Sequence, residues 1–406
     1  MKEPRQTYLD HAATTPLRQV AQQAWLEHQS TANPSSLHSA GRTARHHLEQ
    51  AREQIAALAG AEPAELIFTS GGTEADNLAL KGLYLARRTT ERNAILLTGI
   101  EHLAVLETCQ YLETQHGAEL VFAPVDAEGV VDLEAWERLL SQHRDSLAAA
   151  TLMWANNEVG TIQPVKEAVA LAAQHRVPVH VDAVQAFGAI PVNFADCGAA
   201  TMAVSGHKLG APVGVGGLFV RRDITLHSVS QGGGQERKIR SGTMNVAAAA
   251  AFAAAASEAV ANMSQTGKKL VELRNRLIEA IQEAVPAARL CGPADEDGTQ
   301  RLPNNVHFIF PNCEGDSLLF MLDMQKVYSS TGSACTAGVP KPSHVVLAMG
   351  NSEADSRSVQ RFTLGHDSTI ADVEHVAAVI GSAYEHARQA GMAAQTARIK
   401  TASDGW

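Results

Sequence analysis

The stretch TMAVSGHK, residues 201–208, is an apolar run that ends in a lysine, and a glycine-rich run over 210–217 follows it. The apolar residues predict a buried strand over 201–205. At the mouth of a buried strand a lysine is partly desolvated, which lowers the pKa of its amine and makes Lys208 a candidate nucleophile for a Schiff base. A solvated surface lysine is the alternative interpretation of these residues alone.

Apolar runs alternate with helical patterns on both sides of this stretch. The pattern predicts strands at 66–69, 94–98, 120–124, 148–154, 177–181, 201–205 and 216–220, and helices at 103–115, 132–142 and 165–175. Near-continuous apolar strands separated by helices indicate an α/β fold with a mostly parallel sheet covered on both faces. Ligands of such sheets bind at the carboxyl ends of the strands. The polar residues there are His102, residues 156–158, Asp182, Gln185 and Lys208.

The chain of 406 residues is longer than one compact core of usual size, so two domains are expected. We expect an N-terminal segment over 1–16, a large domain over 17–263, a smaller α+β domain over 264–388 and a loose tail over 389–406. A long helical pattern runs from 246 to about 284 and ends before Pro286.

Charge and cysteine usage exclude several classes of protein. The net charge is -10, and no run of lysines and arginines resembles a nucleic-acid or polybasic membrane patch. The five cysteines are Cys109, Cys197, Cys291, Cys313 and Cys335. They are odd in number and include no CxxC pair, so neither a disulfide framework nor a metal site is expected. The first ten residues lack an apolar signal core, and the apolar run over 246–256 is too short to span a bilayer, so we expect a cytoplasmic protein.

The stretch LIFTSGGTEADN, residues 66–77, reads as a short strand, a glycine turn around Gly72 and the start of a helix. We expect a Thr-x-x-Asp cap, formed by Thr73 and Asp76, at a helix end that presents backbone N–H groups to a phosphate. Thr73 is then the candidate phosphate ligand. An ordinary capped helix after a strand is the alternative.

Asp182 lies at the end of an apolar strand, with Gln185 three residues on. A buried carboxylate there is costly unless it meets a cation, and a protonated ring nitrogen would supply one; a helix cap is the alternative. Ser205 and His207, beside Lys208, could add donors to a phosphate. Pyridoxal phosphate needs three partners in a protein: a lysine for its aldehyde, an aspartate for its ring nitrogen and a turn that binds its phosphate. Lys208, Asp182 and the glycine turn before Thr73 could supply them.

Three further residues are candidates for chemistry. Cys335 lies in a run of small residues over 329–338, which predicts an exposed loop and an accessible thiol. His102 follows a strand end, where a neutral imidazole could stack on a flat ring or move protons, and a structural histidine is the alternative. Arg361 lies in an apolar strand, where a buried guanidinium needs an anionic partner. That partner could be a substrate carboxylate or an acidic residue in an internal salt bridge.

Together these segments resemble the cysteine desulfurases of the NifS and IscS type, within the fold-type I pyridoxal-phosphate enzymes called class V aminotransferases. The resemblance covers residues 7 to 385, and its matching stretches are Tyr8 to Pro16, Phe68 to Asn77, Glu101-His102, Asn156 to Gly160, His180 to Gln185, Ser205 to Lys208, Arg240 to Thr243, Ser330 to Thr336 and Arg361 to Gly365. Gly72 departs from the pattern, because many relatives carry alanine there. The resemblance implies a large domain with a mostly parallel, seven-stranded sheet covered by helices and a smaller α+β C-terminal domain.

For the cofactor, the family pattern implies that Lys208 forms the Schiff base, that Asp182 pairs with the ring nitrogen and that His102 stacks on the ring. Contacts to the ring hydroxyl are implied for Gln185 and Asn157. Ligands of the phosphate would be Thr73, Ser205 and His207, with Thr243 reaching over from the second subunit of a homodimer.

For the reaction, the pattern implies that Arg361 and Asn157 hold the carboxylate of L-cysteine. Lys208 would remove the α-proton, and the Cys335 thiolate would take the sulfur as a persulfide while L-alanine leaves. The acceptor would be an iron-sulfur scaffold or a tRNA-thiolating enzyme. Selenocysteine lyase or transaminase activity with the same cofactor is one alternative, and an inactive dimer that serves as a scaffold in sulfur transfer is another.

Overall fold

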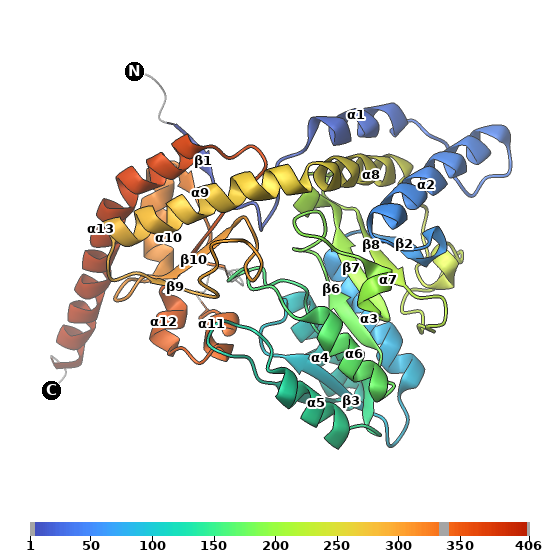
Figure 1. The fold of residues 1–406 in the computed structure, drawn as a ribbon, viewed down its shortest axis with the longest axis horizontal. Coiled ribbons are helices and arrows are strands. Elements are labelled where there is room, and N and C mark those ends of the chain that lie inside the picture. The colour runs from blue at the N-terminus through green and yellow to red at the C-terminus, as the bar shows by residue number, and fades with distance from the viewer. Residues whose placement is uncertain (1–4, 333–340, 404–406) are drawn as a thin grey trace.

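The computed structural model describes residues 5–332 and 341–403, with side chains described as far as residue 390. Figure 1 shows a helix-covered sheet on one side and a smaller group of strands and helices, near both ends of the chain, on the other.

The larger unit is built on a seven-stranded sheet. Its strands, in spatial order, are β2 (Leu66–Thr69), β8 (Gly216–Val220), β7 (Thr201–Ser205), β6 (Val179–Asp182), β5 (Leu147–Thr151), β3 (Ala94–Thr98) and β4 (Glu119–Ala123). Strand β8 is antiparallel to β2 and β7, whereas the other neighbouring pairs are parallel. The expected mostly parallel sheet is therefore confirmed.

The inner strands of this sheet are buried on both faces, whereas the edge strand β4 is partly exposed. Successive side chains of each strand point to opposite faces. In β7, Met202 and Val204 join one hydrophobic cluster and Ala203 joins another. The first cluster includes residues of the helices α2 (Ser39–Leu58), α5 (Leu133–Gln142), α6 (Val165–Gln174) and α8 (Val246–Ala261). The opposite face packs against α3 (Gly72–Arg87) and α4 (Leu103–His116). Two further helices, α1 (Gln19–His28) and the short α7 (Phe194–Cys197), join the first cluster through Ala21, Phe194 and Cys197.

The helical pattern expected from 246 to about 284 is two helices rather than one. Helix α8 ends at Ala261, and α9 (Met263–Ala284) leaves at an angle of 69° after Asn262. The two helices serve different cores: α8 is buried in the large unit, whereas Leu273, Leu277 and other residues of α9 belong to the second core. No single helix in the described ranges is long and apolar enough to span a membrane, and only this bent pair passes when the two are joined.

The smaller unit has its own core around a three-stranded antiparallel sheet. Its elements are β9 (Arg289–Leu290), β10 (Asn305–Ile309), β12 (Val359–Thr363), α10 (Gly315–Met324), α11 (His344–Ala348), α12 (Glu353–Arg357) and α13 (Ile370–Ser403). The N-terminal segment also belongs to this core: β1 (Thr7–Tyr8) pairs with β11 (Val327–Tyr328), and Leu9 is fully buried in it.

The backbone of α13 is helical as far as Ser403, across residues 389–403 of the segment for which the sequence predicts a loose tail. Residues 391–403 read GMAAQTARIKTAS, in which alanine, glutamine, arginine and lysine are good helix formers. These residues lack the apolar spacing of a packed helix, which is why the sequence predicts a tail. Their intrinsic helix propensity is enough to extend the preceding helix.

Candidate active site

A cavity of about 380 Å³ lies at the carboxyl ends of the parallel strands. Ten of the residues expected from the sequence line it: Gly72, Thr73, His102, Asn157, Asp182, Gln185, Ser205, His207, Lys208 and Arg361. Residues that are up to 289 positions apart in the chain, from Gly72 to Arg361, are thus brought to one place by the large sheet and the smaller unit together.

Lys208 directs its amine into this cavity from the turn after β7. Its Nζ donates to the backbone carbonyls of Ala12, at 2.6 Å, and Ala13, at 2.9 Å. Burial lowers the pKa of the amine to about 8, and the nearby cation of Arg361 acts in the same direction. A substantial fraction of this amine is therefore neutral and nucleophilic near neutral pH.

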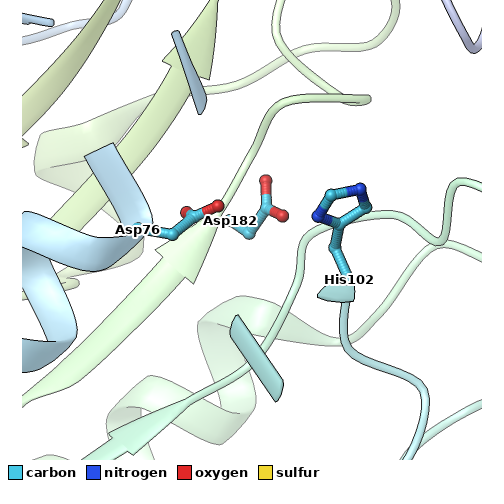
Figure 2. Close-up of side chains that lie close together, drawn as sticks. All are labelled: Asp76, His102 and Asp182. Carbon is cyan, nitrogen blue, oxygen red and sulfur yellow. The ribbon is translucent and has the colours of Figure 1, made fainter. Parts of the chain in front are cut away.

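Asp182 is the last residue of β6 and lies between Asp76 and His102 (Figure 2). One side-chain nitrogen or oxygen atom of each of the three residues lies within 4.8 Å of the others. Asp182 accepts a hydrogen bond from the backbone N–H of Val184 at 2.9 Å, so the turn after the strand fixes the orientation of the carboxyl. Burial raises the pKa of Asp182, so a cationic partner would stabilise its ionised form.

His102 is the N-cap of α4, and its Nδ1 accepts from the backbone N–H of Ala104 at 3.1 Å. With Nδ1 as acceptor, the proton of the neutral ring is on Nε2. Burial lowers the pKa of His102, so the ring is neutral and can face a flat aromatic ligand without desolvating a charge.

The helix end that was expected to bind phosphate is open. Gly71, not Thr73, is the N-cap of α3, and no side chain caps it. The expected Thr-x-x-Asp cap is therefore wrong: Asp76 turns inward, because its carboxyl oxygen Oδ1 lies 3.1 Å from Nε2 of the buried His180. The free N–H groups at the start of α3 remain available to an anion.

Pyridoxal phosphate fits these residues. Ser205 Oγ is buried beside the start of α3 and has no hydrogen-bond partner among the described residues, and a phosphate at the helix end would satisfy it. His207 Nδ1 lies 3.2 Å from Thr14 Oγ1, and burial keeps the pKa of His207 at about 4, so its ring is neutral. The amine of Lys208, the carboxyl of Asp182 and this helix end match the three parts of the cofactor.

Arg361 enters the cavity from β12 of the smaller unit. Its guanidinium donates to the carboxylate of Asp10 at 2.8 Å and to the backbone carbonyl of Asn157 at 2.8 Å. The internal salt bridge that the sequence left open is thus present, with an N-terminal residue that sequence reasoning did not select. The buried Nε has no partner in the described part of the chain and is available to a ligand carboxylate.

Gln185 and Asn157 both line the cavity, and each already makes a hydrogen bond within the chain. Gln185 Nε2 donates to the carbonyl of Ala12 at 3.0 Å, next to Lys208. Asn157 contributes its backbone carbonyl to Arg361.

Two expected residues are not among the described residues that line this cavity. Cys335 lies outside the described residues. Thr243 lies exposed on the surface between Gly242 and α8, away from the cavity of its own chain.

The structure also shows buried acids to which sequence reasoning gave no role in the site. Asp76 and Glu158 line the cavity, and Glu101 lies behind it with a pKa raised to about 8 by burial. Glu158 accepts from Ser343 Oγ at 2.5 Å, and a Cβ on Gly332 would lie 3.1 Å from Glu158 Oε2. Glu158 therefore contacts residues on both sides of the sequence segment that contains Cys335. The sequence signal that could have pointed to Glu158 is its position in NNEVG, residues 156–160, directly after an apolar strand.

Comparison with known families agrees with this geometry. The profile of the class V aminotransferases matches residues 7–376. The chain belongs to the class V aminotransferase family. Within this family, an IscS-like cysteine desulfurase of Mycobacterium tuberculosis is 47% identical over 390 residues, which are 95% of this chain and 98% of the relative. The chain therefore groups with the IscS and NifS type of the class V aminotransferases.

Solved structures of the same family share the fold. A NifS-like protein superimposes with a TM-score of 0.84 at 32% identity and covers 93% of this chain and 99% of its own. A structure described as SspA in complex with cysteine has a TM-score of 0.74 at 30% identity, with 88% of this chain and 98% of that chain covered.

Proposed function

We propose that the protein is a pyridoxal-phosphate-dependent cysteine desulfurase, which converts L-cysteine to L-alanine and leaves the sulfur as a persulfide on Cys335. The observation that carries the proposal is the single cavity in which the Lys208 amine, the Asp182 carboxyl, the open end of α3 and the Arg361 guanidinium lie together. The names of the relatives and the cysteine bound to the SspA structure support the same substrate.

The cofactor would be held at three points by residues of this chain. Lys208 would bind its aldehyde carbon, Asp182 its ring nitrogen, and Thr73, Ser205 and His207 with the N–H groups of α3 its phosphate. When bound, pyridoxal phosphate withdraws electrons from the α-carbon of an attached amino acid.

Each side chain then has a defined task. Arg361 binds the substrate carboxylate with the Nε that has no protein partner, and thereby fixes which bond at the α-carbon faces Lys208. The Lys208 amine, with its lowered pKa, removes the α-proton. The Nε2–H of His102, at the start of α4, can donate a hydrogen bond to a group in the cavity.

Sulfur transfer is balanced without an external oxidant. The Cys335 thiolate attacks the sulfur of the substrate, an S–S bond forms, and the C–S bond breaks with its electron pair on the β-carbon. That carbon takes a proton and becomes the methyl group of alanine. The four other cysteines are buried, and burial raises the pKa of each thiol, so they are poor nucleophiles.

The partners follow from the same proposal. A homodimer would bring the exposed Thr243 of one subunit to the phosphate of the other. The persulfide would pass to a cytoplasmic acceptor, which would be an iron-sulfur scaffold protein or a tRNA-thiolating enzyme.

The test is to mix the purified protein with L-cysteine and to follow alanine and the intact mass of the protein. Wild type should form alanine and gain the mass of sulfur, and Cys335→Ala should lose both. Cys197→Ala, which alters a buried thiol, is the matched control and should behave as wild type. Absence of alanine with bound cofactor would refute the proposal, and alanine formation by Cys335→Ala would indicate a lyase instead.

A further inference from the structure

Asp76 is a buried carboxyl at the edge of the cavity to which the proposed reaction gives no task. It lies in the second turn of α3, is 1% exposed and lines the cavity beside Asp182. Figure 2 shows that the carboxyls of Asp76 and Asp182 lie next to each other, with His102 beyond Asp182. Burying a carboxyl without a cation requires an explanation.

No cation near Asp76 compensates a negative charge. In the part of the chain whose side chains are described, no arginine or lysine forms an ion pair with it, and its polar partner is His180 at 3.1 Å. The fully buried His180 ring is neutral, because burial lowers its pKa to about 3. The titratable groups whose charge acts on Asp76 are other acids, Asp182 on β6 and Glu101 after β3, and each disfavours the ionised form of Asp76 when it is itself ionised.

The hydrogen-bond pattern around His180 accommodates a proton on Asp76. His180 Nδ1 is 2.9 Å from Thr201 Oγ1, and its Nε2 faces Asp76. A neutral imidazole has one donor and one acceptor. When Nδ1–H donates to Thr201, Nε2 is the acceptor, and a protonated Asp76 completes the chain as the donor.

We propose that Asp76 is a neutral carboxylic acid that donates to His180 and, because it stays protonated, leaves Asp182 as the single carboxylate facing the cofactor ring nitrogen. Asp76 is thus a positioning residue that sets the charge next to the ring. This inference rests on the proposed cofactor but not on the desulfurase reaction.

The charge balance of the site explains the arrangement. A protonated ring nitrogen supplies one positive charge, which one ionised carboxylate neutralises, whereas two adjacent carboxylates would repel each other. The other titratable groups that face this pair are Glu101 and His102 after β3, His180 on β6 and Lys208 after β7. Among them, the Lys208 ammonium favours the ionised form of Asp182, and so does the hydrogen bond from the backbone N–H of Val184.

The first test measures the proton directly, in wild-type protein freed of cofactor. Infrared spectra with ¹³C-carboxyl-labelled aspartate should contain a protonated-carboxyl band that shifts with the label, persists at pH 7 and remains in Asp182→Asn. The label separates this band from that of Glu101. If no labelled carboxylic-acid band is present at pH 7, Asp76 is ionised and the proposal is overturned.

The second test uses the cofactor-loaded protein and compares Asp76→Asn with Asp182→Asn. Asparagine has the charge of a protonated aspartate, so Asp76→Asn should keep the pyridoxal-phosphate dissociation constant within about threefold and leave the pH dependence of the cofactor absorption unchanged. Asp182→Asn should weaken binding by more than about tenfold and shift that pH dependence. A comparable shift in Asp76→Asn would overturn the proposal, whether or not the protein forms alanine.

Discussion

At the scale of single residues, Lys208 differs most from an ordinary surface side chain. Its pKa of about 8 arises first from burial and then from Arg361, and the carboxylates of Asp182 and Asp10 oppose this shift only in part. A neutral amine is needed to attack an aldehyde. The rate of covalent attachment of pyridoxal phosphate to the cofactor-free protein should therefore rise as the pH rises through about 8 and then level off.

Stopped-flow absorbance over a pH series measures this rate. Arg361→Gln removes the cation that lowers the pKa of Lys208 and should move the midpoint to higher pH. A midpoint near the usual lysine value of about 10.4 in wild type, or one that Arg361→Gln leaves in place, would contradict the account.

The sequence predicted most of the residues around the cavity. Apart from Arg361 on β12, most of them lie at or just after the ends of apolar strands, and the carboxyl ends of parallel strands meet at one edge. Asp76 and Asp10 escaped prediction for a physical reason. Asp76 lies inside a helix, where its spacing is that of a cap, and only the tertiary fold brings His180 to it. Asp10 lies 351 positions from Arg361, and no local pattern links the two.

At the scale of elements, Glu158 links the start of α11 to the chain before Cys335. Ser343 caps α11 by accepting from the backbone N–H of Val346 and donates its hydroxyl proton to Glu158. Ser343→Ala and Glu158→Gln should slow persulfide formation more than the spectral change that follows cysteine binding, because they alter the ends of the Cys335 segment and leave Lys208 in place. Stopped-flow absorbance and intact mass measure the two steps.

Ser352→Ala is the matched control, since Ser352 caps the exposed helix α12 in the same way. It should leave both steps unchanged. An equal loss in both steps for Ser343→Ala would show that Glu158 acts on the cavity as a whole.

The start of α3 is the second element that can be tested. A Cβ on Gly72 would lie 2.6 Å from Cγ2 of Val184, the residue whose N–H orients Asp182. Gly72→Ala should therefore cost about 1–3 kcal/mol of stability and weaken cofactor binding, and Val184→Ala should restore part of both in the double variant. Thermal unfolding and cofactor titration measure the effects, and a Gly72→Ala protein identical to wild type would contradict the packing argument.

At the scale of the whole molecule, alternating strands and helices predicted the large sheet, since its strands are buried on both faces and read as continuous apolar runs. The bend after Asn262 was not predicted, because the helical pattern continues through it and the two helices part only where they meet different cores. The pairing of β1 with β11 also needs long-range contacts that no local pattern contains.

Global stability should depend on the buried His307. Both ring nitrogens lack hydrogen-bond partners among the described residues, and burial with Arg361 and Arg301 lowers the pKa to about 3, against about 6.5 in the unfolded chain. Between these values the unfolded chain binds a proton that the folded protein does not, so this residue lowers the free energy of unfolding as the pH falls. Above pH 6.5 its effect is constant.

His307→Leu removes this proton uptake. The free energy of unfolding of the variant minus that of wild type should grow by about 1.4 kcal/mol per pH unit below pH 6.5. Denaturant unfolding at pH 5, 6 and 7 measures the difference, with the exposed His386→Leu as the control that should show no such trend. A difference independent of pH would show that His307 titrates alike in both states.

The N-terminal segment has a consequence for biosynthesis. Lys208 donates hydrogen bonds to the backbone carbonyls of Ala12 and Ala13. The strand just before these residues pairs with residues 327–328, and the backbone of Asp10 forms a β-bridge with Thr363. On a ribosome adding roughly 5–20 residues per second, the first ten residues wait tens of seconds for these partners. The large sheet can fold during that time, whereas the pocket around the lysine closes only when translation is nearly complete. Nascent chains that stall earlier should therefore be folded in part and unable to retain pyridoxal phosphate.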